Sequence, residues 1–223
     1  MSKKRLLFPL VTVDIALFTI DGGELKVLLT QRSDAPFRGW RSLPGGVLDP
    51  VVDVNLLEAA NRVMLTKVGL ALPHMEEVCS ASGAARDPRG WSISITYLAL
   101  LPMDQIHVVA GRKVDGIEWA GYGSMTQDLA FDHSLLLKRA HRRLQQKVAA
   151  NVLPLHMLPQ KFTLTQLQRT IETITGTPLE KSAFRRRLKE QHAADLEEVP
   201  GEFERGVQRP AQLWKASKDY RFH

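Results

Sequence analysis

The chain has 223 residues, a net charge of +6 and a sequence pI of about 9.6, and its length suits one large domain or a standard domain plus a small one. No apolar run approaches the length of a membrane-spanning helix, so we expect no membrane partner. The single cysteine, Cys79, excludes an intramolecular disulfide framework and predicts a reducing, cytoplasmic environment. The excess of basic residues is a weak sign of a polyanionic partner.

Two β-rich runs open the chain, at residues 10–20 and 25–31. Asp21-Gly22-Gly23 separates them, and a pair of glycines between two such runs is typical of a β-hairpin. The apolar stretch that follows the basic residues 1–5 alternates like a strand and is broken by Pro9, Thr12 and Asp14, which argues against a signal peptide.

A helix is predicted next, from Asn55 to Val68 and closed by Gly69. Asn55-x-x-Glu58 is typical of a helix start, and Glu58 and Arg62 have the spacing of a favourable i,i+4 pair. Before this helix, residues 32–46 form a loop rich in proline and glycine. After it we expect strands near residues 77–81, 91–101 and 117–119 and a basic amphipathic helix at 134–150, which together predict an α/β unit with a mixed sheet.

The pattern changes after residue 150. Residues 151–160 contain two prolines and no regular periodicity, so we interpret them as a linker. Thr163-x-x-Gln166 predicts a helix start and Gly176 a helix end, and a second helix is expected at 179–192. Residues 200–215 have hairpin character, starting at Pro200-Gly201, with a wing tip at 205–210. Two helices joined by a short turn, followed by a hairpin, indicate a winged helix-turn-helix over residues 161–223.

Residues 46–70 resemble a Nudix box that lacks its carboxylates. Arg62, Met64, Gly69 and Leu70 stand where the pattern has an arginine, an apolar residue, a glycine and an apolar residue. Its glutamate positions hold Val54, Val63, Thr66 and Lys67, and reaching Gly46 takes two extra residues.

Other motifs extend the resemblance along nearly the whole chain. They are Leu43-Pro-Gly-Gly46, Arg86-Asp-Pro-Arg-Gly-Trp91, Leu129-Ala-Phe-Asp-His133, Lys181-Ser-Ala-Phe-Arg-Arg-Arg187 and Arg209-Pro-Ala-Gln-Leu-Trp214. In this order they resemble the Nudix-related transcriptional regulators of bacterial NAD and sugar metabolism. These proteins carry an ADP-ribose-pyrophosphatase-like Nudix domain followed by a winged helix. Two departures are Arg41 in place of a tryptophan before Leu43-Pro44, and a longer wing sequence.

The resemblance implies an α+β fold with two parts. A Nudix α/β/α sandwich with a mixed sheet is expected over residues 1–150, and a winged helix-turn-helix DNA-binding domain over 161–223. The implied function is a DNA-binding regulator, expected to be a repressor of NAD or related sugar or nucleotide metabolism. Its expected partners are a palindromic double-stranded operator, a second copy of the chain, and an effector such as ADP-ribose or another NAD-related nucleotide. Whether the effector releases or tightens DNA binding stays open.

Nudix hydrolysis requires Mg²⁺, which prefers carboxylate oxygens. Positions 63, 66 and 67 share one helix face, so glutamates there would converge on one ion, whereas valine, threonine and lysine cannot hold it. We therefore expect no metal, no cofactor and no hydrolysis. The alternative is a hydrolase of ADP-ribose or a related nucleoside diphosphate that uses Asp49, Asp53 or Glu58 as non-standard ligands. A third possibility is a C-terminal domain that binds protein instead of DNA.

Guanidinium groups offer a way to hold a diphosphate without a metal, although some of these arginines could equally be solvated loop side chains. Asp132 and His133 are expected to cap the following helix or to bind the neighbouring loop, in preference to a catalytic pair. The candidate ligand-binding residues are Arg32, Arg38, Arg41, Gly45, Gly46, Arg62, Lys67, Arg86 and Arg89.

The second helix of the C-terminal part carries the candidate DNA contacts. Consecutive arginines fan across a broad arc, so one or two would reach base edges while the others bind phosphates. Lys181 and Ser182 are expected at phosphate through the helix N-terminus, and Phe184 and Leu188 in the core. The alternative is a solvated basic face. The full set is Lys181, Ser182, Arg185, Arg186, Arg187, Lys189, Arg205, Gln208 and Arg209.

Overall fold

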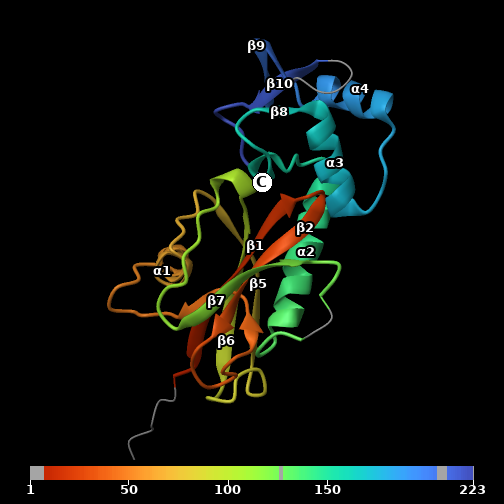
Figure 1. The fold of residues 1–223 in the computed structure, drawn as a ribbon. Coiled ribbons are helices and arrows are strands. Elements are labelled where there is room, and N and C mark those ends of the chain that lie inside the picture. Colours follow the sequence, from red (N-terminus) through yellow and green to blue (C-terminus); the bar gives the residue numbers. More distant parts are fainter. Residues whose placement is uncertain (1–7, 126–127, 205–209, 223) are drawn as a thin grey trace, which may run out of the picture.

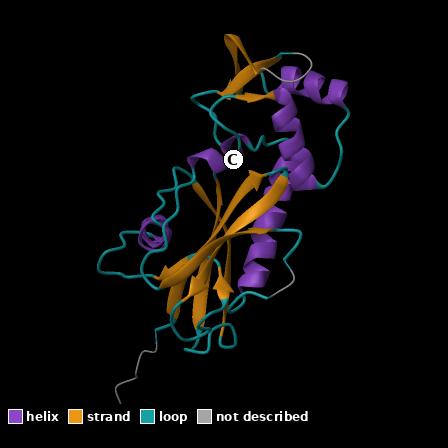
Figure 2. Ribbon diagram, viewed as in Figure 1, coloured by secondary structure: helices purple, strands orange, loops and turns teal. Residues whose placement is uncertain are grey.

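The computed structural model describes residues 8–125, 128–204 and 210–222. Figures 1 and 2 show a β-sheet with a helix on each side and, at the C-terminal end, a smaller unit of two helices and a three-stranded sheet. No helix among the described residues is long and apolar enough to cross a membrane.

The larger sheet is mixed, as predicted. Its central path is β3-β2-β1-β6-β5, β4 pairs with β1 and β7 pairs with β2. Strands β1 and β6 run parallel and the other pairs are antiparallel. The strands are β1 (Leu10–Asp21), β2 (Glu24–Arg32), β3 (Arg41–Ser42), β4 (Gly45–Val47), β5 (Met75–Gly83), β6 (Ser92–Leu100) and β7 (Val114–Gly121). The predicted hairpin joins β1 to β2, and Gly22 and Gly23 take φ values of 59° and 80°, which favour glycine.

Helix α1 (Leu56–Val68) begins and ends where the sequence predicts. The Asn55 side chain accepts a hydrogen bond from the Glu58 amide, and Gly69 closes the helix in the left-handed conformation. Its apolar face packs on β1 and β4. The expected Glu58–Arg62 pair is not what forms, because the Arg62 guanidinium binds Asp53 at 2.6 Å while Glu58 is exposed.

Helix α2 (His133–Ala149) covers the opposite face of the sheet (Figure 1). Alternate residues of β1 point to the two faces, so that Ile15 and Leu17 join the α1 side and Ala16 and Phe18 the α2 side. A short 3-10 helix, η1 (Met103–Gln105), follows β6.

The C-terminal unit has the predicted winged-helix order: β8 (Phe162–Thr163), α3 (Leu164–Thr175), α4 (Lys181–Gln191), β9 (Leu196–Glu204) and β10 (Ala211–Ala216). Thr163 and Gln166 form the predicted capping box, and Gly176 closes α3 with φ of 68°. The strands pair in the order β8-β10-β9. Pro200-Gly201 does not start the hairpin as expected but lies inside β9, which begins earlier, at the buried Leu196.

The segment expected to be an irregular linker is packed. Residues 151–160 contain the 3-10 helix η2 (Leu155–Met157), and Leu153, Leu155, Met157 and Leu158 are buried. They belong to one apolar cluster that runs from the sheet through α2 into α3 and α4. The physical reason is composition: five of the ten residues carry large apolar side chains, and their burial stabilises the segment although it has no regular periodicity.

Polar contacts join the two parts as well. Thr173 of α3 donates to the Gly23 carbonyl of the β1–β2 hairpin at 3.3 Å, and Gln145 of α2 donates to the Ile174 carbonyl at 3.1 Å. The C-terminal tail returns to the same junction, where Phe222 is buried and the Tyr220 hydroxyl donates to the Leu153 carbonyl.

Candidate functional site

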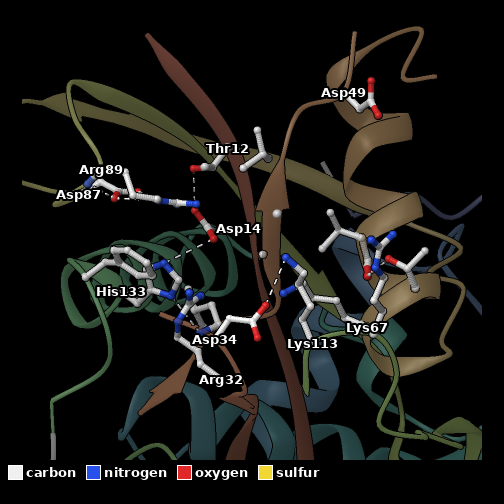
Figure 3. A pocket seen from close by; sticks show the side chains of 18 of the residues that line it. Thr12, Asp14, Arg32, Asp34, Asp49, Lys67, Asp87, Arg89, Lys113 and His133 are labelled. Carbon is white, nitrogen blue, oxygen red and sulfur yellow. Dashed lines mark hydrogen bonds and ion pairs between the residues drawn. The ribbon is translucent and has the colours of Figure 1, made fainter. Parts of the chain in front are cut away.

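A cavity of about 510 Å³ opens between α1, the ends of β1 and β4, and the loops around residues 32–35, 86–89 and 112–113 (Figure 3). A volume of this size suits a nucleotide-sized ligand. Seven cations and four carboxylates line it: Arg32, Arg62, Lys67, Arg86, Arg89, Arg112 and Lys113, with Asp14, Asp34, Asp49 and Asp87.

The box positions on α1 face this cavity, as their spacing predicts. Val63, Thr66 and Lys67 all line it. Val63 is 1% exposed, and a Cβ on Gly46 would lie 2.7 Å from its Cγ2 atom. A Cβ on Gly45 would likewise meet the Asp14 carboxylate at 1.8 Å. Both glycines are therefore required for close packing of the cavity wall.

The residues present do not fit a Mg²⁺ site. Asp53 is held by two hydrogen bonds from Arg62, each 2.6 Å, and these hold the pKa of its carboxyl below the ordinary value. Asp49 lies on the cavity wall and Glu58 points to solvent, so these carboxylates do not converge. Across residues 8–125, 128–204 and 210–222 no three His, Cys, Asp or Glu side chains gather in a way that could hold a metal.

Arg86 and Arg89 line the cavity as predicted, but each also binds a carboxylate. Arg86 makes a two-pronged contact with Asp132, at 3.0 Å from Nε and 2.8 Å from Nη2, and donates to the Ser92 hydroxyl. Arg89 pairs with Asp87 at 2.7 Å. Asp132 precedes α2 but makes no side-chain cap. Of the two roles expected of it, it therefore binds a neighbouring loop, through Arg86.

His133 binds the neighbouring loop, one of the two roles expected of it. Its Nδ1 accepts a hydrogen bond from the Leu43 amide at 3.0 Å, so the ring proton is on Nε2, which faces Asp14 Oδ1 at 3.4 Å. Burial lowers the pKa of His133, and the charge of Asp14 only partly opposes this. Asp14 in turn accepts from Ser94 at 2.5 Å. The contacts hold the Leu43-Pro-Gly-Gly46 loop against β1.

Two predicted ligand-binding residues lie elsewhere. Arg41, on β3, lines a separate cavity of about 680 Å³ and pairs with Glu118 at 3.3 Å. Arg38 does not line the first cavity, and its Nε donates to the Ser33 carbonyl. Arg32 does line it, with its guanidinium 4.8 Å above the Phe131 ring.

Sequence reasoning missed several residues of the cavity: Thr12, Asp14, Asp34, Asp87, Arg112, Lys113 and Phe131. Asp14 carried a signal, because a charge within an apolar strand needs buried partners. Phe131 lies within the Leu129-Ala-Phe-Asp-His133 motif, whereas Lys113 carried no signal. Both have positive φ values, of 57° and 63° respectively.

A basic surface covers the second helix of the winged helix. Lys181, Arg185, Arg186 and Lys189 are exposed, and Phe184 and Leu188 are buried as predicted. Arg187 differs, since it is half-buried with its guanidinium 5.8 Å from the Phe184 ring. The predicted wing residues Arg205, Gln208 and Arg209 lie outside the described residues.

The N-terminus of α4 does not offer the free amides expected for phosphate. The Glu180 carboxylate accepts hydrogen bonds from the Ser182 and Ala183 amides, at 2.8 and 2.6 Å, and from the Ser182 hydroxyl. These bonds lower the pKa of Glu180 to about 2. A carboxylate therefore already occupies the position expected for phosphate.

Comparison with known proteins assigns both parts of the chain. Residues 9–140 match the NUDIX domain family and residues 154–216 the NrtR DNA-binding winged helix domain. The ADPR-responsive transcriptional repressor NtrR of Acinetobacter baylyi is 40% identical, over 96% of this chain and 85% of that protein. The chain belongs to the NrtR family of Nudix-related transcriptional regulators.

NrtR of Shewanella oneidensis shares the architecture. Its structure in complex with a 27mer DNA has a TM-score of 0.81, 35% identity and 93% coverage of both chains. The NUDIX domain of the same NrtR, in complex with ADP ribose, has a TM-score of 0.60 and 36% identity and covers 65% of this chain and 94% of that one. The predicted NrtR fold class, a Nudix domain with a mixed sheet followed by a winged helix, is confirmed.

Proposed function

We propose that the chain is a transcriptional repressor that holds operator DNA through its winged helix and releases it when an ADP-ribose-like ligand fills the Nudix cavity. The observation that carries the proposal is a cavity lined by cations, with no carboxylates at the Nudix-box positions of its α1 wall. A shared apolar core joins the domain that holds this cavity to the winged helix, whose basic helix α4 is exposed. The relatives support the proposal. One is an ADPR-responsive transcriptional repressor, and structures of Shewanella oneidensis NrtR contain DNA or ADP ribose. We infer that residues 1–150 sense the ligand and 161–223 bind DNA, joined by the packed segment 151–160.

The DNA contacts are proposed on α4, where Arg185 and Arg186 are exposed while Phe184 and Leu188 are buried. Arginine is suited to bidentate contact with guanine in the major groove, and Lys181 and Lys189 are suited to phosphates. We propose that the β9–β10 hairpin is the wing. Strand β9 is acidic, and lysines of the same domain neutralise part of its negative charge: Lys215 pairs with Glu197 at 2.8 Å, and Lys161 pairs with Glu202.

We propose that two copies act together on a palindromic operator, because helix-turn-helix units usually bind half-sites spaced by one helical turn or a multiple of it. The regulated genes are proposed to be those of NAD or related sugar or nucleotide metabolism, because ADP-ribose derives from NAD. Footprinting on DNA upstream of the protein's own gene and its neighbours, with one half-site scrambled, tests both statements. If the operator with one scrambled half-site is protected as well as the intact operator, the proposal that two copies bind together is contradicted.

Substitution of Arg186 by alanine tests the DNA site. We expect Arg186→Ala to weaken operator binding by about tenfold or more, because a lost base contact costs ~1–3 kcal/mol. Wild-type binding should weaken steeply between about 50 and about 200 mM salt. Arg139→Ala, which removes an exposed arginine from α2, is the matched control. A wild type without salt-sensitive DNA binding would favour a protein-binding C-terminal domain instead.

Titration of ADP-ribose into the preformed DNA complex tests the response. Release at concentrations that also raise the protein's melting temperature is expected, with NAD, nicotinamide mononucleotide and phosphorylated sugars as comparisons. Tighter DNA binding on addition of ADP-ribose would reverse the proposed direction of the effect.

The second candidate is an ADP-ribose hydrolase with unusual ligands, and the observation in its favour is Asp49 on the cavity wall. We propose that the chain does not hydrolyse ADP-ribose, since Lys67 and Val63 stand where a bridging metal needs carboxylates. A turnover assay with Mg²⁺ decides the matter. Hydrolysis that disappears in Asp49→Asn would establish the hydrolase.

A further inference from the structure

Lys67 places an ammonium group on the wall of the cavity, at a box position where a Nudix hydrolase binds metal through glutamate. Figure 3 shows it near Lys113, which reaches toward Asp34, and the two lysines are close enough for the charge of one to lower the pKa of the other. A cation therefore stands at a position where the Nudix pattern has a metal ligand.

The charge of Lys67 lacks a close counter-ion. Four of the other six cations of the cavity pair with carboxylates: Arg62 with Asp53 at 2.6 Å, Arg86 with Asp132 at 2.8 Å, Arg89 with Asp87 at 2.7 Å and Lys113 with Asp34 at 3.2 Å. Within the described part of the chain, no carboxylate lies at ion-pair distance from the Lys67 ammonium. Burial lowers its pKa, the charge of Arg32 lowers it further, and Asp14 only partly opposes them. A bound anion would remove this penalty.

A loop before β7 brings two more cations to the same place. The amides of Val109, Gly111 and Arg112 donate to the carbonyls of Val68, Lys67 and Thr66, at 3.0, 2.9 and 2.9 Å. These carbonyls belong to the last turn of α1 and have no partner within the helix. Gly111 makes the approach possible, since a Cβ there would lie 2.2 Å from the Thr66 carbonyl oxygen.

The docked loop fixes Arg112 and Lys113 at the cavity. Lys113 adopts a positive φ of 63°, a conformation that a non-glycine residue keeps only where the surrounding contacts hold it. Lys67, Arg112 and Lys113 thus form a cationic group, called here the lysine corner, on a rigid support of helix end and hydrogen-bonded loop.

We propose that the lysine corner takes the place of the divalent cation and neutralises the diphosphate of the ligand, so that this chain binds a nucleoside diphosphate sugar without metal. The inference rests on the proposed function and deepens it by naming the part of the ligand that the chain recognises through charge. Of the two lysines, Lys67 makes the central contact, because among the described residues its ammonium has no carboxylate at ion-pair distance, whereas Lys113 pairs with Asp34. Lys113 exchanges Asp34, which is half-exposed, for a phosphate oxygen.

Calorimetric titration of ADP-ribose into the full-length protein, in EDTA and then in excess Mg²⁺, is the test. We expect the same affinity in both. Lys67→Met, which keeps the length of the side chain and removes its charge, should weaken binding about tenfold or more, and Lys67→Arg should bind close to wild type. Lys138→Met, at an exposed lysine of α2, is the matched control. A requirement for Mg²⁺, or a folded Lys67→Met that binds as wild type does, would overturn the inference.

Inorganic pyrophosphate separates this inference from the proposed function. Pyrophosphate binding to wild type in EDTA that is lost in Lys67→Met supports the lysine corner even if ADP-ribose fails to release DNA. Conversely, ADP-ribose could release DNA only in the presence of Mg²⁺ and equally well from wild type and Lys67→Met. That result would support the repressor function and contradict the role of the lysine corner. If Lys67→Met does not fold, two other measurements test the inference. One is the comparison of wild-type binding in EDTA and in Mg²⁺. The other is pyrophosphate binding by Lys113→Gln, a substitution at an exposed lysine, which we expect to be weaker than that of wild type.

Discussion

Arg86 is a buried guanidinium at the edge of the cavity, and one carboxylate balances most of its charge. Its side chain is 8% exposed and faces Asp132, which comes 46 residues later. Local sequence patterns identify both residues and predict that Asp132 caps the helix or binds a neighbouring loop. They do not name Arg86 as its partner, because a distant partner leaves no local mark. Lys113 was missed for the same reason, since strand pairing and loop docking place it.

Asp132→Ala should destabilise the protein by about 3 kcal/mol, because it leaves the Arg86 charge buried without its partner. Urea denaturation at neutral pH measures the change. Asp128→Ala, a nearby exposed aspartate, should change the free energy of unfolding by less than about 0.5 kcal/mol. Equal curves for the two variants would show that solvent already balances Arg86.

At the scale of elements, Glu76 of β5 holds helix α2 to the sheet. Arg143 donates to it at 2.8 Å, and the buried Lys147, which also donates to the Phe222 carbonyl, forms a second ion pair with it. Burial alone would raise the pKa of Glu76, but the two cations outweigh burial and hold it below the ordinary 4.5. A lowered pKa gives stability that is present above pH 4.5 and is lost as the pH falls through the folded-state value.

Glu76→Gln should cost about 2 kcal/mol at pH 7, because it leaves Lys147 with a weakened partner. The gap between wild type and Glu76→Gln should stay constant at neutral pH and shrink as the pH drops below 4.5, where Glu76 is protonated in the unfolded chain. Thermal melts from neutral to acidic pH would show this. Glu77→Gln, an exposed neighbour on the same strand, is the control, and a gap independent of pH would contradict the assignment.

Elements themselves were predictable where a few adjacent residues define them. The caps of α1 and α3 and the β1–β2 turn follow from Asn55, the Thr163–Gln166 pair and the two glycines at positions 22 and 23, because each acts on its own backbone. The segment at residues 151–160 was misread because its two prolines suggested a free connection. Its role depends on which surfaces the apolar side chains meet, and periodicity does not report that.

At the scale of the whole molecule, a single apolar cluster joins the sheet, α2, η2 and the winged helix. Such a core predicts that the two parts of one chain move as a unit. In the proposed dimer, we therefore expect a ligand in the cavity to change the distance between the two DNA-binding helices by altering how the two copies meet. We do not expect it to bend each chain at its middle.

Phe222→Ala tests the shared core, because Phe222 is 1% exposed and lies against Lys147 at the junction. We expect a loss of about 3–5 kcal/mol in the free energy of unfolding. Fluorescence and circular dichroism should report one coincident transition for wild type. Phe203→Ala, at a 52% exposed phenylalanine of β9, should have little effect. Two separate wild-type transitions would mean that the parts unfold independently.

The contact between Val63 and Gly46 also bears on how this chain could change. A glutamate at position 63 would enter a space that an aliphatic side chain already fills, and it would meet Lys67 there in place of a metal ion. A glutamate at this position is therefore expected to cost stability. The buried valine that closes the cavity wall thus disfavours a carboxylate at the position where the Nudix pattern has one.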